Sequence, residues 1–472
     1  MISPSRLVPT LTALAALLLV PAAAGADADA RAAEAKPGAT HVAGEVVLRY
    51  RKGVGSGARA AVQRAVGVGG ARAFAPHTRV LQIRDDDSVA ATVRELRARP
   101  EVATAAANKI ARLSTYIPGD PGDSGLPGGW QQLQWNFLPG VGVNAPDAWQ
   151  RLIDRGRGGG KGVVVAVLDT GVAYTDHKRF RRSPDFARGD FVKGWDFVDG
   201  DRFPTDENGH GTHVASTIGE RTGNAVGVTG LAYGAQIMPV RVLDRYGAGD
   251  SVNITAGIRF AVRHGANVIN LSFEFDDGFR QVTASEIPDI LAALRYARRH
   301  NVVVVAAAGN QSRSTVAYPA RYDSVIGVGA ITEHGCRAQY SNAGRGLDIM
   351  APGGGPDDPN DPTCPAGAPE GRGIFQMTYP WAAADSAPRT AGSYRRFGLP
   401  RRFVGTSMAA PHVAATAALV LASGILGKHP KSREVAARLQ ATAVDAGPAG
   451  FDPYYGAGRL DAAAATDPAR AR

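Results

Sequence analysis

The stretch VVVAVLDTG, residues Val163–Gly171, places a carboxylate at the end of a continuous apolar run. A short run of this kind, bounded by glycine, is typical of a strand that is buried on both faces of a parallel sheet. A second such run is Val302–Ala308, and Ala256–His264 and Ile290–Arg299 have helical patterns. We therefore expect an α/β domain with a mostly parallel sheet, which binds its ligand at the carboxyl ends of the strands.

Two further motifs carry groups that can do chemistry. They are NGHGTHVA at Asn208–Ala215 and GTSMAAPHV at Gly405–Val413. A serine hydroxyl is a poor nucleophile until a base takes its proton, and that base works best when a carboxylate fixes its tautomer. Asp169, His210 and Ser407 follow one another in a chain order that is known for such triads.

Each motif also has a plainer interpretation. Asp169 could cap the next turn, and Ser407 could be a helix N-cap and nothing more. His210 and His213 could share a metal ion, although no third ligand is apparent nearby in the sequence. The three motifs together favour a triad. The motif around Ser407 lacks the second glycine of a nucleophile elbow, which argues against an α/β-hydrolase esterase.

The three motifs resemble those of the subtilases, the subtilisin-like serine peptidases, and the resemblance runs from about Trp130 to Ala464. It implies a subtilisin-like three-layer α/β domain over residues 130–472, which hydrolyses peptide bonds in proteins through an acyl-enzyme. Four residues match the family's catalytic positions: Asp169 the orienting carboxylate, His210 the general base, Ser407 the nucleophile and Asn310 the side-chain donor to the oxyanion.

The resemblance also assigns the walls of the substrate cleft. One wall contains Ser272, Phe273 and Glu274, and the facing wall contains Ala307, Ala308 and Gly309. Many subtilases have SLGG where this chain has SFEF at residues 272–275. Glu274 could therefore place a carboxylate at the pocket mouth and favour a Lys or Arg side chain of the substrate. Alternatively, Glu274 turns to solvent while Phe273 and Phe275 form an apolar pocket, which is the interpretation we favour from the sequence.

Two loops suggest structural calcium, which takes six to eight oxygen ligands. The first resembles a medium-affinity calcium site of some subtilases through Asp196, Asp199 and Asp201, with a solvated acidic loop as the alternative. The second loop, residues 222–228, resembles the family's tight calcium site. Its matching ligands are the side chains of Asp185 and Asn224 and the backbone carbonyls of Thr222, Val226 and Val228, with Gln131 a weaker match.

The N-terminal part of the chain has a different organisation. A basic start, a short apolar run and an Ala-x-Ala end predict a secretory signal peptide at residues 1–26. Residues 27–43 have no periodic apolar face and predict a linker. Export implies a secreted protein, extracellular or periplasmic, and no membrane partner is expected because no other run could span a bilayer.

Residues 44–112 predict a small α+β unit. Strands are indicated at Val46–Leu48, Val80–Ile83 and Val102–Ala106, and a capped amphipathic helix at Ser88–Arg99. The unit looks like the inhibitory propeptide of subtilases and is expected to be a partner of the catalytic domain. A segment rich in Pro, Gly and Asp, residues 113–129, predicts a linker, and we expect self-cleavage between about Asn108 and Gly125.

Composition excludes several other classes. The chain of 472 residues is 44% hydrophobic and 20% charged, as in soluble globular proteins. Its net charge of +10 is concentrated in residues 27–112, which hold 15 Lys and Arg against 9 Asp and Glu, and no nucleic-acid motif accompanies the charge. We expect no nucleic-acid partner, and a monomer. The two cysteines, Cys336 and Cys364, are expected to pair in an oxidising compartment.

The sequence therefore predicts a secreted, calcium-stabilised serine endopeptidase that is made as a self-processed precursor. One competing hypothesis is a non-catalytic secreted binding protein with the same fold, and another is an esterase or peptide transferase with the same triad. The segment 353–403 is longer than usual for the family, and its role is open between a lid, a substrate-binding loop and decoration.

Overall fold

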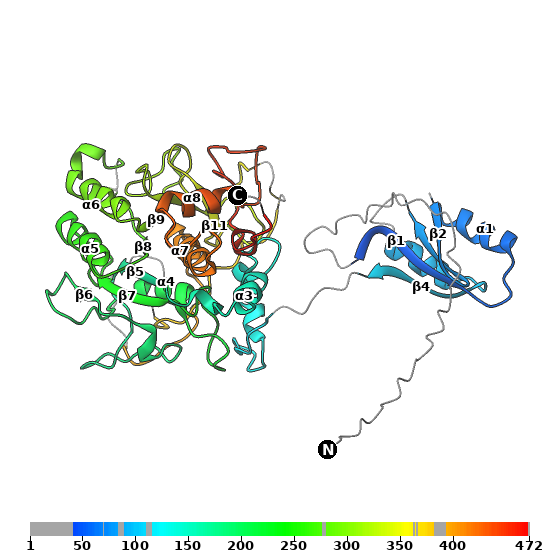
Figure 1. Cartoon of the computed structure of the whole chain (residues 1–472), viewed down its shortest axis with the longest axis horizontal. Coiled ribbons are helices and arrows are strands. Elements are labelled where there is room, and N and C mark those ends of the chain that lie inside the picture. The colour runs from blue at the N-terminus through cyan, green and yellow to red at the C-terminus, as the bar shows by residue number, and fades with distance from the viewer. Residues whose placement is uncertain are drawn as a thin grey trace, which may run out of the picture. The chain divides into compact units, whose positions relative to one another are not determined.

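The computed structural model describes residues 41–68, 70–83, 89–109, 116–275, 280–361, 364, 367–381 and 393–470. The chain divides into two compact units, Met1–Ala111 and Arg112–Arg472 (Figure 1). The predicted signal peptide, residues 27–40 of the first linker and the predicted helix cap Ser88 lie outside the described residues.

The N-terminal unit is an antiparallel sheet with strand order β2-β3-β1-β4, accompanied by two helices. The elements are β1 His41–Tyr50, α1 Ser56–Ala65, β2 Gly70–Ala75, β3 Thr78–Gln82, α2 Val89–Arg97 and β4 Val102–Lys109. Every second residue at the end of β1 is buried, namely Val46, Leu48 and Tyr50, because side chains alternate between the faces of a strand.

These residues form one core with Val93 and Leu96 of α2. The predicted α+β unit is thus confirmed at the level of its elements. Sequence reasoning missed α1 and β2. All six residues of β2 are exposed, so its sequence GARAFA carries no apolar alternation that could reveal a strand.

The second unit contains a sheet of seven strands in the order β11-β10-β9-β8-β5-β7-β6, and every neighbouring pair is parallel. The strands are β5 Val164–Asp169, β6 Trp195–Asp196, β7 Gln236–Arg241, β8 Val268–Leu271, β9 Val303–Ala307, β10 Ile326–Ile331 and β11 Ile349–Pro352. The α-helices are α3 Ala145–Ile153, α4 His210–Gly219, α5 Ser251–Arg263, α6 Pro288–Arg299, α7 Thr406–Ser423, α8 Ser432–Ala441 and α9 Ala462–Ala465.

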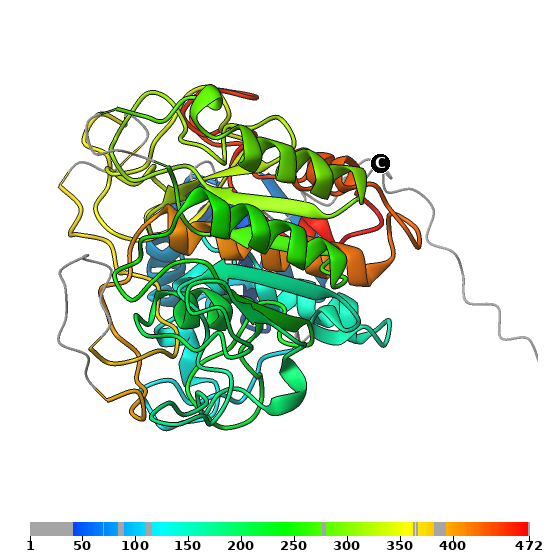
Figure 2. The same cartoon turned by 90° about the vertical axis from the view of Figure 1, so that its left-hand side faces the viewer.

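Helices cover both faces of this sheet, so the unit has three layers (Figures 1 and 2). Along β5, Val165 and Val167 pack into the core on the side of α4 and α7, whereas Ala166 and Leu168 pack into the core on the side of α5 and α6. Burial on both faces is why β5 has no polar alternation. Helix α7 is long and apolar enough to cross a membrane, but 83% of it is buried in this unit, as expected of a core helix.

The described part of the predicted linker at 113–129 is not a linker but part of the second unit. Asp120 is fully buried, and its carboxylate accepts hydrogen bonds from the backbone of Gly223 and Asn224. The N–H of Gly122 donates to the carbonyl of Gly227 at 2.8 Å. The many Pro, Gly and Asp residues therefore form tight turns against the body of the unit rather than a free connection.

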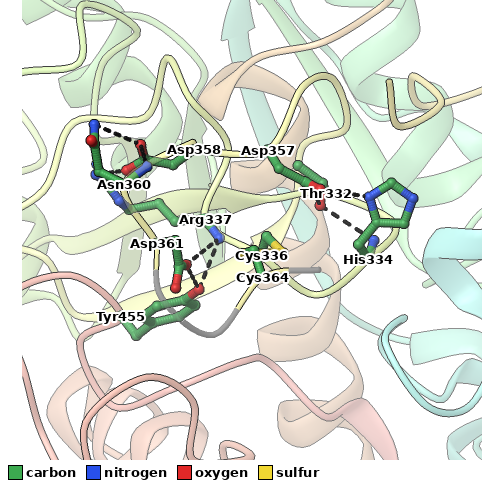
Figure 3. Close-up of a disulfide and its surroundings, with 10 residues drawn as sticks. All are labelled: Thr332, His334, Cys336, Arg337, Asp357, Asp358, Asn360, Asp361, Cys364 and Tyr455. Atoms are coloured by element: carbon green, nitrogen blue, oxygen red, sulfur yellow. Dashed lines mark hydrogen bonds and ion pairs between the residues drawn. A yellow bond between two sulfur atoms is a disulfide. The ribbon is translucent and has the colours of Figure 1, made fainter. Parts of the chain in front are cut away.

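Cys336 and Cys364 form a disulfide with a Cα–Cα distance of 5.6 Å, which confirms the predicted pairing (Figure 3). Hydrogen bonds hold the neighbouring carboxylates: Asp357 contacts Thr332 and His334, and the Asp361 carboxylate contacts the Tyr455 hydroxyl. The start of the long 353–403 segment is therefore fixed to the body of the unit.

A later part of the same segment packs against helix α4. The Ile374 carbonyl accepts a hydrogen bond from His213, and the Met377 carbonyl accepts one from Ser216. The Thr378 hydroxyl donates to the Gly209 carbonyl at 2.6 Å. Residues 374–378 thus support the helix that begins at His210.

Candidate active site

The end of β5 and the start of α4 bring a carboxylate and an imidazole together. Asp169 is the last residue of β5, and His210 is the first residue of α4. Asp169 Oδ1 lies 2.8 Å from His210 Nδ1 and also accepts the Thr170 N–H at 2.7 Å. The Asp169 side chain is fully buried, whereas 22% of the His210 side chain is exposed. The imidazole therefore has one edge on the carboxylate and remains partly accessible.

Gly211 allows this close approach. A Cβ at this position would collide with the Gly171 carbonyl oxygen and lie 3.0 Å from Asp169 Oδ1. The glycine of the HGTH motif thus has a packing reason, since a side chain would push α4 away from the end of β5.

Asp206 fixes the loop that leads to His210, a role that sequence reasoning missed. Its buried carboxylate accepts hydrogen bonds from the Thr170 hydroxyl, from the N–H groups of Asn208 and Gly209, and from both the N–H and the hydroxyl of Thr212. These five bonds join the end of β5 to the start of α4. Asp206 follows closely after Asp201 in the sequence, and no spacing rule distinguishes a carboxylate that fixes a loop from one that would bind a metal ion.

Ser407 lies in the first turn of α7. Its hydroxyl donates to the Ser272 carbonyl at 3.0 Å, and the Ser272 hydroxyl donates to the Ser407 carbonyl at 2.8 Å. Among the described residues, no hydrogen bond joins Ser407 to His210. Nucleophile–base contacts are often long without a substrate, and the lack of such a bond is common in sites of this kind.

Asn310 and Ser407 itself each offer an N–H donor near the proposed nucleophile. Asn310 Oδ1 accepts hydrogen bonds from the N–H and the hydroxyl of Thr406 at 2.8 and 2.9 Å, which fixes the amide so that its Nδ2 is the free end. The Ser407 N–H belongs to the first helical turn, where backbone donors have no partner within the helix. The carboxyl end of the sheet thus offers a hydroxyl with two donors for a developing anion.

The residues predicted to form the walls of the substrate cleft differ in their burial and contacts. Ala307 and Ala308 are buried, one in the core on each face of the sheet. Ser272 contacts Ser407, as described above. Gly309 donates its N–H to the Thr406 hydroxyl at 3.2 Å, and Glu274 lies against it.

His213 is separate from this group. It is fully buried, its Nε2 bonds to the Ile374 carbonyl at 3.0 Å, and its ring stacks on Phe403 with centroids 4.0 Å apart. Burial lowers the pKa of His213 to about 3, so the ring is neutral. Its contacts support α4 and the 353–403 segment.

The acidic loop around residue 196 is paired with an arginine from strand β7. Arg241, which is 3% exposed, contacts the Asp196 carboxylate at 2.9 Å and the Asp199 carboxylate at 2.7 Å. Asp201 Oδ1 accepts the Phe203 N–H at 2.7 Å. The repulsion that suggested calcium here is therefore reduced by Arg241, a residue 40 positions or more away in sequence that spacing could not reveal.

The loop at 222–228 gathers buried carboxyl groups. Asp185 Oδ1 accepts a hydrogen bond from Asn224 Nδ2 at 2.8 Å, and Asp185 Oδ2 is buried without a partner among the described residues. Burial raises the pKa of Asp185 to about 8, and burial with the nearby Asp185 charge raises the pKa of Glu220 well above its ordinary value. Sequence reasoning missed Glu220 and Asp120, and the Gln131 side chain instead donates to the Gly128 carbonyl at 3.1 Å.

Comparisons with known proteins agree with this architecture. The subtilase family matches residues 160–458, and the fervidolysin N-terminal prodomain matches residues 27–108. The chain belongs to the subtilase family, the subtilisin-like serine endopeptidases, and carries an N-terminal prodomain.

Individual relatives cover most of the chain. It is 32% identical to the thermophilic serine proteinase of Bacillus sp. (strain AK1), over 81% of this chain and 79% of that protein. It is 32% identical to thermitase of Thermoactinomyces vulgaris, over 74% and 98%. A solved protease structure from Pseudoalteromonas arctica PAMC 21717 is 29% identical, covers 74% of this chain and 99% of that one, and has a TM-score of 0.55.

Proposed function

We propose that the chain hydrolyses peptide bonds by an Asp169–His210–Ser407 triad. Ser407 attacks the peptide carbonyl, and His210 takes its proton and returns it to the leaving amine. Asp169 holds the imidazole, while Asn310 Nδ2 and the Ser407 N–H bind the oxyanion. The observation that carries the proposal is the 2.8 Å contact between buried Asp169 and His210 at the sheet edge that also presents Ser407.

A serine-directed fluorophosphonate probe together with a peptide substrate tests this function. The protease should be labelled at Ser407 and should cleave the peptide, and both signals should disappear in Ser407→Ala. Labelling without peptide cleavage, but with ester cleavage, would favour the esterase hypothesis. A protein that is neither labelled nor active would favour the binding-protein hypothesis.

The pH dependence follows from the pKa of His210. Burial alone lowers this pKa, but the Asp169 charge and hydrogen bond outweigh burial, so the net pKa is raised above its ordinary value. A protonated His210 cannot accept the Ser407 proton. We therefore expect kcat/KM to fall about tenfold per pH unit below an inflection that lies above the ordinary histidine value of about 6.5. A pH profile of kcat/KM that is flat from pH 5 to 8 would contradict this role of His210.

We propose that the prodomain is removed by the enzyme itself. Strand β4 ends at Lys109, and from Tyr116 onward the chain packs in the catalytic unit, where Tyr116 contacts Trp149. Cleavage is therefore expected between Lys109 and Tyr116, a narrower range than the sequence indicated. The predicted signal peptide supports secretion to an extracellular or periplasmic space. The expected monomer would carry a complete catalytic site, because all proposed catalytic groups lie in one chain.

The Ser407→Ala variant should accumulate as the full precursor, because its own cleavage is lost. N-terminal sequencing of wild type and variant, expressed in a host without other extracellular proteases, measures this. Normal maturation of the variant in that host would show that another protease makes the cut.

We also propose that calcium binds at the 222–228 loop. The ligands would be the side chains of Asp185, Asn224 and Asp120 with the carbonyls of Thr222, Val226 and Val228. Two observations support the fit: Asp185 Oδ2 is buried without a hydrogen bond, and none of the three carbonyls accepts a hydrogen bond from a described residue. Among the described residues, no three His, Cys, Asp or Glu side chains could alone hold a metal, so the carbonyls would have to contribute.

Chelation should lower the melting temperature of the catalytic unit. A ligand bound only to the native state stabilises it by about 4 kcal/mol at 1,000 times its Kd. All five tryptophans lie in this unit, so tryptophan fluorescence reports its unfolding. The Ser407→Ala background removes self-digestion from the measurement.

The chelator response should be lost in Asp185→Asn and retained in Asp201→Asn, because Arg241 already balances the acidic loop around residue 196. A melting curve that does not move on chelation, even after prolonged dialysis, would remove the proposed calcium site.

A further inference from the structure

The side chains that follow strand β8 alternate between two environments. Ser272 faces Ser407, to which it is joined by two hydrogen bonds. Phe273 and Phe275 share the other side, where both pack against the core under α5 and α6 with their rings 6.2 Å apart. Because side chains two residues apart lie on the same side of an extended chain, Glu274 follows Ser272 on the side of the nucleophile.

The carboxylate of Glu274 lies against the backbone of Gly309. A Cβ at Gly309 would collide with Glu274 Oε2, and the φ of Gly309 is +107°, which also favours glycine. The Gly309 N–H in turn donates to the hydroxyl of Thr406, the residue before Ser407. The Glu274 carboxylate therefore contacts Gly309, which in turn contacts the residue next to the nucleophile.

Gln311 holds this carboxylate in place. Its Oε1 accepts hydrogen bonds from the Asn310 N–H and from Asn342 Nδ2, both at 3.1 Å. Its Nε2 must then point the other way, and it donates to Glu274 Oε1 at 2.7 Å. A carboxylate fixed in this way does not turn outward. The two phenylalanines pack against the core on the other side of the chain, so they do not form the walls of an apolar pocket beside Ser407.

We propose that Glu274 determines specificity by selecting Lys or Arg as the substrate residue whose carbonyl Ser407 attacks. The proposal rests on the proposed protease function. The side chain of that residue enters between Ser272 and Gly309, the two groups that flank Ser407. A cation at its end meets the fixed carboxylate in a partly sheltered site, where the attraction exceeds that in water.

Matched peptides test this directly. Two peptides differ only in Lys or norleucine before the scissile bond, which share the same unbranched carbon side chain with and without the terminal ammonium group. Wild type should have the higher kcat/KM for Lys, and the Lys to norleucine ratio should fall about 10- to 100-fold in Glu274→Gln. The control Glu286→Gln removes an exposed carboxylate that pairs with Arg280 and should leave the ratio unchanged.

A charge reversal distinguishes recognition from a structural role. Glu274→Lys should prefer a peptide with Glu over one with Gln before the scissile bond, which a merely structural carboxylate would not produce. A wild-type preference for norleucine, or the same Lys to norleucine ratio in wild type and Glu274→Gln, overturns this specificity proposal. The proposed protease function still stands in that case, provided that the norleucine peptide is cleaved. If wild type cleaves no peptide at all, the protease function itself fails.

Discussion

Replacing Asp169 by Asn should lower kcat/KM by about 10⁴-fold, the scale known for serine triads. In the proposed mechanism His210 takes the Ser407 proton and becomes a cation 2.8 Å from a fully buried carboxylate. Little water screens this pair, so removing the negative charge removes stabilisation that exists mainly in the transition state. Steady-state kinetics on a peptide substrate measures the loss.

The same variant should also move the acid limb of the pH profile to lower pH, because the Asp169 charge is the largest of the influences that raise the pKa of His210. Asp154→Asn, which changes an exposed carboxylate in the same way, should leave both properties unaltered. A decrease of less than tenfold in Asp169→Asn, with the limb unmoved, would exclude Asp169 from the triad.

Replacing Asn310 by Ala should lower kcat by about 10² to 10³-fold with little change in KM. This scale comes from the oxyanion donor of subtilisin. The effect should fall on kcat because, in the proposed mechanism, the Asn310 amide binds charge that develops only after Ser407 attacks. The Asn310 Oδ1 also accepts the N–H and hydroxyl of Thr406, so the alanine variant disturbs structure as well.

Asn310→Asp separates the two roles, since it keeps the acceptor for Thr406 but replaces the Nδ2 donor by oxygen. If Asn310 acts as a donor, the aspartate variant should be at least as slow as the alanine variant. Recovery of wild-type kcat in Asn310→Asp would mean that the residue only positions Thr406.

The fold was predictable where burial of an element produces a clear apolar pattern in its sequence. Apolar runs such as Val163–Leu168 predicted parallel strands because both faces of this sheet are covered. The exposed β2 carried no such pattern and was missed. The segment 113–129 was misread because its Pro, Gly and Asp residues indicate turns, whereas whether those turns pack, as at Asp120, depends on partners more than 100 residues away.

The candidate site was predictable for those residues that belong to a distinctive local sequence motif. Asp169, His210, Ser407 and Asn310 each stand in a distinctive motif, and the structure brings them to one edge of the sheet. The residues that fix the surrounding loops stand in no such motif. Asp206 fixes the loop before His210, Gln311 holds Glu274, and Arg241 pairs with Asp196, all through contacts that exist only after folding.

The orientation of Glu274 could not be read from sequence either, since its neighbours Phe273 and Phe275 equally suggested an apolar pocket. What decides it is contact with Gly309 and Gln311, which are more than 30 residues away.

Digestion of denatured casein by purified mature protein, with wild type beside Ser407→Ala, tests the central claim most directly. To allow a fair comparison, the variant's prodomain is removed by a second protease before the assay. Released peptides, identified by mass spectrometry, should appear with wild type and fall by about 10⁶-fold in the variant, the scale measured for loss of the serine in subtilisin. Equal digestion by both proteins, or none by wild type, would contradict a peptidase that acts through Ser407.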